Sequence, residues 1–490
     1  MLKTLVLKEL KSILLSPKFP VTFAVASILM VLSVYVGIEE YRASVSQYQA
    51  ANQLVRQEMR EARNWGGLVN RIYREPDPMQ IFVSGVHNDI GRFSSISSWQ
   101  PIKLLNSVYN DDPIFAIFRF IDFSFIVEIV LTLFAILFTY DAVNGEREGG
   151  TLQLTLANAV PRARVILAKF IGSWLGLVIP LLIPLVLCVL MLVVFGVPMD
   201  VSHWVRLALL VGSSALLFTC FVAFGIFFST LTRRSNVSFL LCLVTWIGTV
   251  LIIPRFGIMM AGQIIPVPTV AETESQQDVF AKNRWDEHMK VLQDRWKKRE
   301  AGLQRLNEKQ RKAKREEMEW TWVEEDQKDR KEVQNDIDAN ARRLNEELRN
   351  RKQAQERLAF TLSRVSPVSA FQLTAMSLAW TDIGLKDRYE DDLNSFRTAF
   401  NQYKDQKAKE SGATGGIRIS VDSKSGIKID AGREIALDLA GLPEFQHQRP
   451  TLTASLAPSI LDYGLLFLYS LLAFAGAFLR FLRYDVRYAN

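Results

Sequence analysis

Long apolar runs alternate with polar segments along the whole chain. A helix that crosses the hydrocarbon core of a bilayer needs about 20 predominantly apolar residues. Six runs fit this length, and they occupy residues 20–37, 120–140, 170–197, 205–231, 235–263 and 457–480. The pattern therefore predicts six transmembrane helices and a multi-pass membrane protein.

Basic residues near the ends of these runs predict how the chain is oriented. Lysine and arginine close to a span resist translocation and stay on the cytoplasmic side. They lie before the first run, between the second and third, between the fourth and fifth, and after the last: Lys3, Lys8, Lys11, Lys18, Arg147, Arg162, Arg164, Lys169, Arg233, Arg234, Arg480, Arg483 and Arg487. With six spans, all these sets share one side. We therefore expect segment 1–19 and tail 481–490 in the cytoplasm, and regions 38–119 and 264–456 outside.

Region 264–456 contains a heptad pattern. Apolar positions advance in alternating steps of four and three along two stretches. The first contains Trp285, Met289, Leu292, Trp296, Leu303 and Leu306, with Arg299 at the one interrupted position, and the second contains Ile337, Ala341, Leu344, Leu348 and Leu358. This spacing is typical of coiled-coil helices. It predicts a long antiparallel coiled-coil hairpin at about 276–360. Each arm would extend on the order of 60 Å at 1.5 Å per residue.

The turn of this hairpin is predicted at residues 317–326, which places Trp320 and Trp322 at its tip. Exposed aromatic residues often anchor interfaces, so the two tryptophans are candidates for contact with a partner outside the membrane. They would equally serve to cap the hairpin by packing on its last layer, and this structural interpretation is preferred.

The remaining parts of the external regions predict a mixed domain. Apolar residues alternate along residues 416–430 on both sides of a Ser-Lys-Ser-Gly turn, which is typical of a β-hairpin. Residues 411–416 are rich in glycine and suit a flexible joint. Region 38–119 begins with a helical pattern and becomes irregular near its prolines. The predicted fold is therefore a predominantly α membrane protein with a mixed α/β extracytoplasmic domain.

Composition and charge exclude several classes of function. The net charge is +7, but much of the positive excess lies at membrane flanks, so it does not indicate a nucleic-acid partner. Cys188, Cys220 and Cys242 all lie in predicted spans, so no disulfide is expected outside. The four histidines lack metal-ligand spacing, and no His-Glu-x-x-His or Gly-x-Ser-x-Gly motif occurs. We expect no catalytic residue and no metal site.

Residues 141–169, between the second and third runs, contain the sequence NGEREGGTLQLTLANAVPRAR. Asn144 and Gly145 suit a tight bend, and Thr151 could serve as the N-cap of a short helix. The alternation of leucines at Leu152, Leu154 and Leu156 would equally fit a strand. Pro161 ends the element. A short element joined to two spans is well placed to transmit force.

This segment resembles the corresponding loop of ABC transporter permeases of the ABC-2 type. In that family Gly-Glu-Arg/Lys-Glu-x-Gly-Thr-Leu is followed by a Pro or Ser, an Arg, and a Lys at the next span. The N-terminal VLKELKSILLSPKF is similar to the family's amphipathic surface helix, and residues 364–382 are similar to the external region of a bacterial subgroup. That subgroup is related to the permeases of nitrous-oxide-reductase maturation and of gliding motility.

The resemblance implies that residues 145–156 dock in a groove of a cytoplasmic ABC ATPase dimer. The motif residues are Gly145, Glu146, Arg147, Glu148, Gly150, Thr151, Leu152 and Leu154. The charged triplet Glu146, Arg147 and Glu148 would make polar contacts at the groove edge, while Thr151, Leu152 and Leu154 would seat the helix. The alternative interpretation is a polar loop that merely obeys the positive-inside rule. The resemblance also implies a second permease, identical or related, and a location in the bacterial cytoplasmic (inner) membrane.

No Gly-x-x-x-x-Gly-Lys-Ser/Thr motif occurs in the chain, so it has no P-loop for nucleotide phosphates. We therefore expect no cofactor in this chain and no enzymatic activity of its own. ATP and Mg²⁺ would be bound by the partner ATPase.

Five residues inside the predicted spans are candidates for special roles. Gly172 and Gly176 form a Gly-x-x-x-Gly pair that would serve either a permease dimer or, preferably, internal packing. Pro180 and Pro184 are expected to bend the third span, because neither has an amide hydrogen to donate. Glu128 could line a translocation path, lie near the outer interface beside Asp122, or pair with a neighbouring helix, and the last two are preferred.

Three functions remain compatible with these features. The chain could be an export or extraction permease, or a mechanotransmitter that moves its external arm against a periplasmic or outer-membrane partner without passing a solute. It could also be a membrane anchor for a coiled coil. The segment at 145–156 argues against the anchor, while the long arm keeps the mechanotransmitter open.

Overall fold

The computed structural model describes residues 2–65, 67–87, 90–91, 93–96, 122–158, 160–304, 308–411, 417–422, 426–431, 436–447 and 449–484. The side chains of residues 302–324, 327 and 417–431 are outside the description. The predicted joint at 411–416, the β-hairpin turn, the side chains of Trp320 and Trp322, and the tail beyond 484 therefore lie wholly or largely outside it.

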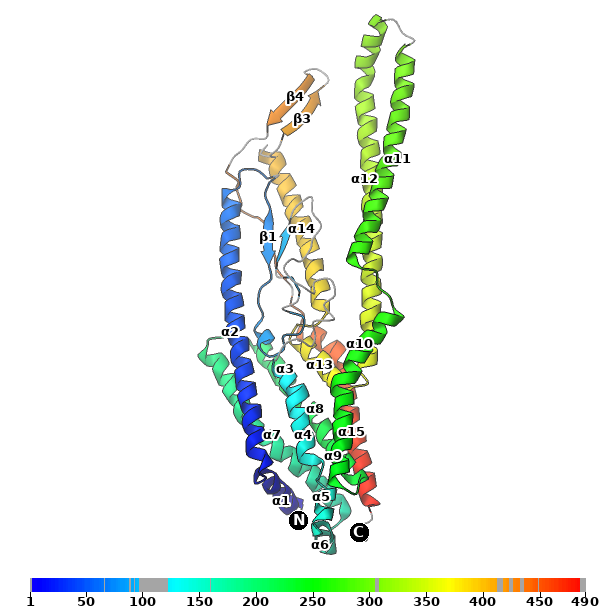
Figure 1. The fold of residues 1–490 in the computed structure, drawn as a ribbon. Coiled ribbons are helices and arrows are strands. Elements are labelled where there is room, and N and C mark those ends of the chain that lie inside the picture. The colour runs from blue at the N-terminus through cyan, green and yellow to red at the C-terminus, as the bar shows by residue number, and fades with distance from the viewer. Residues whose placement is uncertain are drawn as a thin grey trace. The chain divides into compact units, whose positions relative to one another are not determined.

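The chain divides into two compact units. Unit 1 comprises Met1–Ile258, Phe360–Gly415 and Gly432–Asn490, and unit 2 comprises Met259–Ala359 and Gly416–Ala431. Figure 1 shows the ribbon of both.

Among the described residues, six helices are long and apolar enough to cross a membrane, as the six apolar runs predict. They are α2 (Lys18–Glu61), the segment α3–η3–α4–α5 (Phe123–Glu148), α7 (Arg162–Val194), α8 (Val201–Leu231), the segment α9–η4–α10 (Ser235–Ile264) and α15 (Leu452–Leu482). The first, α2, continues far beyond the apolar run, because no proline or glycine interrupts the polar residues that follow Gly37. Pro180 and Pro184 lie inside one continuous α7, and the bend expected there stays a prediction.

Two of these segments contain a π-helical turn, in which each carbonyl bonds the amide five residues later. They are η3 (Ile126–Leu131), between α3 (Phe123–Phe125) and α4 (Thr132–Thr139), and η4 (Ile247–Ile252), between α9 (Ser235–Trp246) and α10 (Ile253–Ile264). Such turns are rare and frequently occur at functional positions.

Small residues determine how closely the helices of unit 1 approach one another. A Cβ atom on Gly225 of α8 would lie only 1.8 Å from Thr139 Oγ1 of α4, and one on Gly476 of α15 would lie 2.9 Å from Phe227 of α8. Helix α8 therefore packs directly against both α4 and α15. At one end of unit 1, α1 (Leu2–Leu14), α5 (Asn144–Glu148), α6 (Thr151–Ala157) and the end of α15 lie together (Figure 1).

The rest of unit 1 is a small mixed α/β region. Strands β1 (Asn70–Tyr73) and β2 (Phe93–Ile96) pair antiparallel, with Asn70 opposite Ile96. The short helix η1 (Pro78–Ile81) begins at Asp77, whose carboxylate accepts a hydrogen bond from the Met79 amide. Helix α13 (Pro367–Leu378) is buried along almost its whole length, and α14 (Gly384–Ser411) follows it.

Unit 2 contains two long helices and a β-hairpin. Helices α11 (Val270–Gln304) and α12 (Glu308–Ser363) run antiparallel, since Arg284 pairs with Asp336 while Arg299, further along α11, pairs with Glu325. The second helix extends beyond unit 2 at its C-terminal end. Strands β3 (Ile417–Asp422) and β4 (Gly426–Ala431) pair antiparallel in the segment with alternating apolar residues.

Two details of the predicted helical hairpin are wrong. Residues 317–326 lie inside α12 and not in a turn, because the chain leaves α11 at Gln304, well before them; Trp320 and Trp322 are therefore not at the turn. Met289 and Trp296, expected at the seam, are 50% and 51% exposed. The side of α11 that meets α12 carries Leu292 with Arg284, Arg295 and Arg299, whose ion pairs with α12 take the place of an apolar seam.

Candidate functional site

The segment between the second and third candidate spans folds as two short helices. Helix α5 ends at Glu148 and α6 begins at Thr151, with Gly149 and Gly150 between them. Gly150 has φ +71°, a left-handed conformation that glycine adopts without steric cost. The expected bend at Asn144 and Gly145 is wrong, because both residues are helical, and the N-cap of α6 is Gly150 and not Thr151. The strand alternative for the leucines is excluded.

Asn144 fixes α5 to the end of α8 and the start of α9. Its side chain is fully buried: Oδ1 accepts a hydrogen bond from Ser229 Oγ at 3.0 Å, and Nδ2 donates one to Thr232 Oγ1 at 3.0 Å. Ser229 Oγ also accepts the amide of Val143 at 2.9 Å. Because a buried amide group needs partners for both its oxygen and its nitrogen, this arrangement holds α5 in one position.

Glu146 connects α5 to α1 and α7. Its Oε1 lies 2.7 Å from Lys8 Nζ, and its Oε2 lies 3.0 Å from Lys169 Nζ. Lys169 is 1% exposed and also lies 3.2 Å from Glu9. The two lysines and two glutamates balance in charge, which offsets the cost of burying Lys169. We call Lys8, Glu9, Glu146 and Lys169 the four-charge cluster.

The cluster also affects the proton affinity of Lys8. Burial lowers the pKa of Lys8, but the hydrogen bond from its ammonium group to Glu146 and the attraction of Glu146 and Glu9 outweigh this, so its pKa lies above the usual lysine value. Lys8 is therefore charged at neutral pH, and the contact between α1 and α5 is an ion pair.

Arg147 and Glu148 connect α5 to two further elements. The guanidinium of Arg147 donates to Tyr484 Oη at 3.3 Å and lies 5.4 Å from the centre of the Tyr484 ring, just beyond the end of α15. Glu148 accepts the amide and the hydroxyl of Ser235, both at 2.8 Å. A carboxylate at the first turn of α9 also suits the positive end of that helix dipole. Glu146, Arg147 and Glu148 thus each hold a different part of the membrane bundle.

The charged triplet is bound within the chain, and the contacts with the edge of an ATPase groove that the resemblance implies for it stay a prediction. Its three side chains contact the chain itself, and Leu152 is fully buried. Besides Glu148, the exposed residues within 145–156 are Gly149, Gly150, Thr151, Gln153 and Leu154, and Leu154 is 67% exposed. A partner that touches this end of the molecule would meet α6 first.

The pair Gly172 and Gly176 is the surface on which α1 packs. A Cβ atom on Gly172 would lie 2.5 Å from Glu9 Cβ, and one on Gly176 would lie 3.3 Å from Ile13 Cδ1. Both glycines face α1 within the same chain, and this close approach brings Glu9 within reach of Lys169. The glycine pair is evident in the sequence, but the helix that it contacts is known only from the structure.

These features fit what comparison with known proteins finds. Residues 3–486 match the family described as ABC-2 family transporter protein. The chain belongs to this family. A stretch of 125 residues is 33% identical to the probable ABC transporter permease protein NosY of Stutzerimonas stutzeri, and it covers 25% of this chain and 45% of that relative. The chain thus matches less than half of the relative's length, and the resemblance seen in the sequence is confirmed at the level of the family.

Glu128 of this ABC-2 protein lies in the π-helical turn η3 and is buried. Within the described part of the chain, its Oε1 has no hydrogen-bond partner. Asp122, by contrast, caps α3 by accepting the Phe125 amide at 2.9 Å and also accepts the Ser84 amide at 2.8 Å. No described group pairs with the Glu128 carboxylate by a salt bridge, so pairing with a neighbouring helix is not seen. In the same residues, no three His, Cys, Asp or Glu side chains gather to hold a metal.

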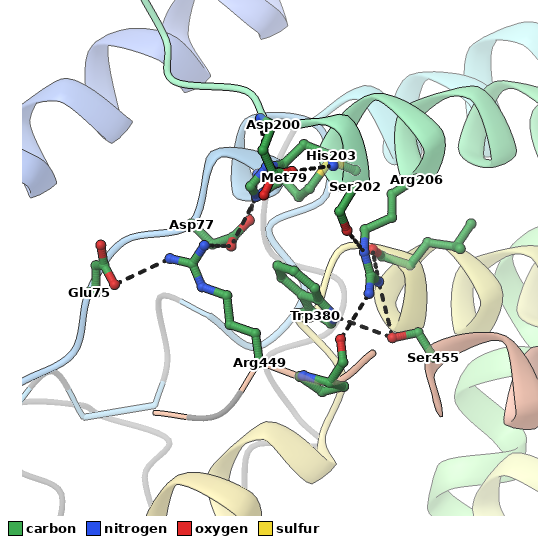
Figure 2. A network of polar contacts seen from close by, with 12 residues as sticks. Glu75, Asp77, Met79, Asp200, Ser202, His203, Arg206, Trp380, Arg449 and Ser455 are labelled. Atoms are coloured by element: carbon green, nitrogen blue, oxygen red, sulfur yellow. Dashed lines mark hydrogen bonds and ion pairs between the residues drawn. The ribbon is translucent and has the colours of Figure 1, made fainter. Parts of the chain in front are cut away.

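A second polar network lies where α8 begins, at the opposite end of that helix from Ser229 (Figure 2). Arg206 is fully buried and donates to Leu378 O, Ser455 Oγ and Pro450 O at 3.0–3.1 Å. Its guanidinium lies 3.8 Å from the centre of the Trp380 ring. Arg206 therefore ties α8 to α13, to the start of α15 and to the segment that precedes it.

A series of charged residues in contact with one another lies next to Arg206. Arg449 lies 3.3 Å from Glu75 and 3.6 Å from Asp77, and Asp77 lies 3.5 Å from His203 Nε2 (Figure 2). This network was not predicted from the sequence, because its members come from four separate segments with no shared motif. Arg206 lies one residue inside the predicted span 205–231. A charged residue inside a span often has a functional role, and this position was the one sequence feature that could have indicated the network.

Proposed function

We propose that this ABC-2 family protein is the membrane subunit of an ATP-driven complex. In this proposal a cytoplasmic ABC ATPase dimer docks on α6, and a second permease, identical or related, completes the membrane part. The observation that carries it is the arrangement of α5. Glu146 binds α1 and α7, Arg147 binds the residue just beyond α15, and Glu148 binds α9. Helix α6, in contrast, exposes Thr151 and Leu154.

The geometry suits transmission of force from α6 into the bundle. A push on α6 reaches α5 across only Gly149 and Gly150, and α5 is held by Asn144 and by the charged triplet. Hydrogen bonds to charged groups each contribute about 1.5–3 kcal/mol, so these contacts can move the attached helix ends together before they break. A movement of α5 would therefore displace the ends of several spans together. It would not be absorbed by the bending of a single loop.

The same arrangement supports the proposed location and partners. Helices α1, α5 and α6 and the end of α15 lie at one end of unit 1 (Figure 1), and the basic flanks predict that this end faces the cytoplasm. The proposed location is the bacterial cytoplasmic (inner) membrane. Since the sequence contains no P-loop, the partner ATPase would bind ATP and Mg²⁺, and this chain would be non-catalytic.

We propose that the complex exports or extracts a substrate. One observation, the length of α12, favours a second candidate function. Helix α12 has 56 residues and contains neither proline nor glycine, so it would extend about 84 Å at 1.5 Å per residue. A helix of this length is not needed for a pore. It favours, as the alternative, a mechanotransmitter that moves an extracytoplasmic arm against a periplasmic or outer-membrane partner without passing a solute.

The docking proposal is tested with Leu154→Asp. The chain is purified from its native host through an affinity tag, and co-purified ATPase activity is measured. A charge at a docking hot spot costs more than about 2 kcal/mol, so we expect roughly 30-fold weaker recovery of the ATPase. The matched control is Leu54→Asp, because Leu54 is also an exposed leucine of a helix, at 53%, but lies on the part of α2 predicted to be outside. Equal ATPase recovery with both variants would contradict docking on α6.

A further inference from the structure

The C-terminal end of α12 is fixed to α15 by one arginine. Arg364 directly follows α12, and its Nε and Nη2 lie 2.6 and 3.1 Å from the two carboxylate oxygens of Asp462. Asp462 is 2% exposed and lies inside α15. Tyr469, two helical turns further along α15, donates its hydroxyl to the Arg364 carbonyl at 2.8 Å. Both the side chain and the backbone of Arg364 are therefore held by α15.

Two serines on either side of Arg364 hold the same end of α12 to the fifth candidate span. Ser363 Oγ donates to Pro254 O at 3.3 Å, and Ser366 Oγ donates to Thr249 O. Thr249 lies in the π-helical turn η4, where the Ile253 amide bonds Gly248 O, five residues back. By the same spacing Thr249 O would need the amide of Pro254, which has none. Ser366 thus supplies the donor that this carbonyl lacks.

The backbone of η4 is well suited to change its hydrogen bonding. A π-helical turn next to a proline already departs from the regular α-helical pattern, and its carbonyls can exchange partners with a small shift of the helix. Helix α12, in contrast, has no glycine or proline over its whole length and resists bending. A shift that reaches Arg364 would therefore be passed along α12 and not absorbed within it.

We propose that Ser363, Arg364, Ser366 and Asp462, with the η4 carbonyls, form a mechanical joint. A change in the position of α15 relative to η4 pulls on Arg364 from one side and on the two serines from the other, and so turns the end of α12. The joint thereby transfers movement of the fifth and sixth spans to the long helix. This inference rests on the proposed function, because it requires an ATPase to move the spans.

The chemistry of the pair supports this role over simple stabilisation. A carboxylate inside a membrane span is costly and is usually functional. A buried ion pair is often no more stable than apolar residues of the same volume, so stability alone is a poor reason to keep it. The two parallel hydrogen bonds of an arginine and a carboxylate do, however, fix the relative orientation of their backbones. Fixed orientation is what a joint needs.

The test measures movement of α12 in the complete complex with its ATPase. Cys188, Cys220 and Cys242 are replaced by alanine, and spin labels are placed on cysteines that replace the exposed Asn350 of α12 and Ser395 of α14. Distances between the labels are measured by pulsed electron paramagnetic resonance without nucleotide and after trapping with ATP and vanadate. We expect a shift of several ångströms, and we expect Asp462→Asn to reduce it by at least half without loss of ATPase activity.

The matched control is Asp382→Asn, which removes another ion pair of an aspartate with an arginine, Asp382 with Arg388 at 2.8 Å, and changes none of the four residues of the joint. It is expected to leave the distance shift unchanged. A full shift in Asp462→Asn would overturn the joint, as would an active wild-type complex without any shift. If the wild-type complex contains no ATPase, the proposed function fails instead, and the two failures are thus distinguished.

A second measurement needs no ATPase. Ser366→Ala removes the donor to Thr249 O, so we expect faster amide hydrogen exchange in residues 247–258 and in residues 360–366 together. Ser395→Ala, on the exposed face of α14, is the control and should change neither segment. Unchanged exchange in both segments of Ser366→Ala would also overturn the joint.

Discussion

The ammonium group of Lys169 lies 3.0 Å from Glu146 and 3.2 Å from Glu9, although Lys169 is only 1% exposed. One buried cation of α7 thus joins the N-terminal helix to α5. Because a buried charge is costly unless it is paired and hydrogen-bonded, the positions of α1, α5 and α7 depend on one another.

The first prediction concerns Glu146→Gln. This change keeps the shape of the side chain but leaves both lysines with Glu9 alone: Lys169 at 3.2 Å, and Lys8 at 3.8 Å after the loss of its closer partner at 2.7 Å. We expect a loss of about 1–3 kcal/mol in the free energy of unfolding, because hydrogen bonds to a charged group are lost. Thermal unfolding in detergent measures it. Glu39→Gln, in an exposed pair with Arg42, is the control and should change stability little. Equal stability of the two variants would contradict the role of the four-charge cluster.

The second prediction concerns the glycines under α1. Gly172→Ala places a Cβ atom 2.5 Å from Glu9 Cβ and 3.1 Å from the Val6 carbonyl, so α1 must move away. Gly176→Ala is milder, because its nearest atom is at 3.3 Å and belongs to the flexible Ile13 side chain. Gly212→Ala is the control, with no atom within 4 Å. We expect the rate of proteolysis within α1 to fall in the order Gly172→Ala, Gly176→Ala, Gly212→Ala. Any other order would show that α1 does not depend on this surface.

The third prediction concerns the connection between α5 and α6. Gly150 has φ +71° but open space around it, so Gly150→Ala costs about 1–2 kcal/mol through backbone conformation alone. Gly149→Ala, at φ −79°, is the matched control and should be tolerated. If α6 transmits the ATPase cycle, we expect Gly150→Ala to lower the ATPase activity of the complex while co-purification persists. Equal activity in both variants would argue against a strict geometry between the two helices.

The fourth prediction concerns His447, which lies outside the spans. Its Nδ1 lies 2.6 Å from Asp392, its ring faces Tyr389 at 5.1 Å, and Arg388 and Arg74 are the nearby cations. Burial lowers the pKa of His447 below its usual value, although Asp392 opposes this effect. The folded state therefore favours the neutral imidazole, and its contribution to stability is present above the unfolded pKa of about 6.5 and is lost as the pH falls.

We accordingly expect unit 1 to lose stability between pH 7 and pH 5, and His447→Gln to show a smaller loss over the same interval. Thermal unfolding at several pH values measures this difference. If wild type and His447→Gln lose the same stability between pH 7 and pH 5, His447 is not the cause of the pH dependence.

Elements whose signal is local could be predicted from the amino-acid sequence. Six apolar runs are enough to predict six spans, since water-free surroundings force such a run into a helix with all its backbone hydrogen bonds satisfied. The alternation around Ile417 and Ile429 is likewise enough for a β-hairpin, and the strand pair appears with Ile419 opposite Ile429. The motif at 145–156 located the candidate site because its glycines and charges are close together in the chain.

The partners of the charged residues, in contrast, depend on how distant segments pack together in three dimensions. Glu146, Arg147 and Glu148 have the composition of an exposed loop, yet their partners come from α1, α7, α9 and the end of α15, far away in sequence. The contact between α11 and α12 differs from the predicted seam for a related reason. Arg295 and Arg299 of α11 face acidic residues of α12, while Trp296 is half exposed. A periodic pattern predicts which residues lie on one face of a helix. Which residues of two helices meet depends on the side chains of both helices.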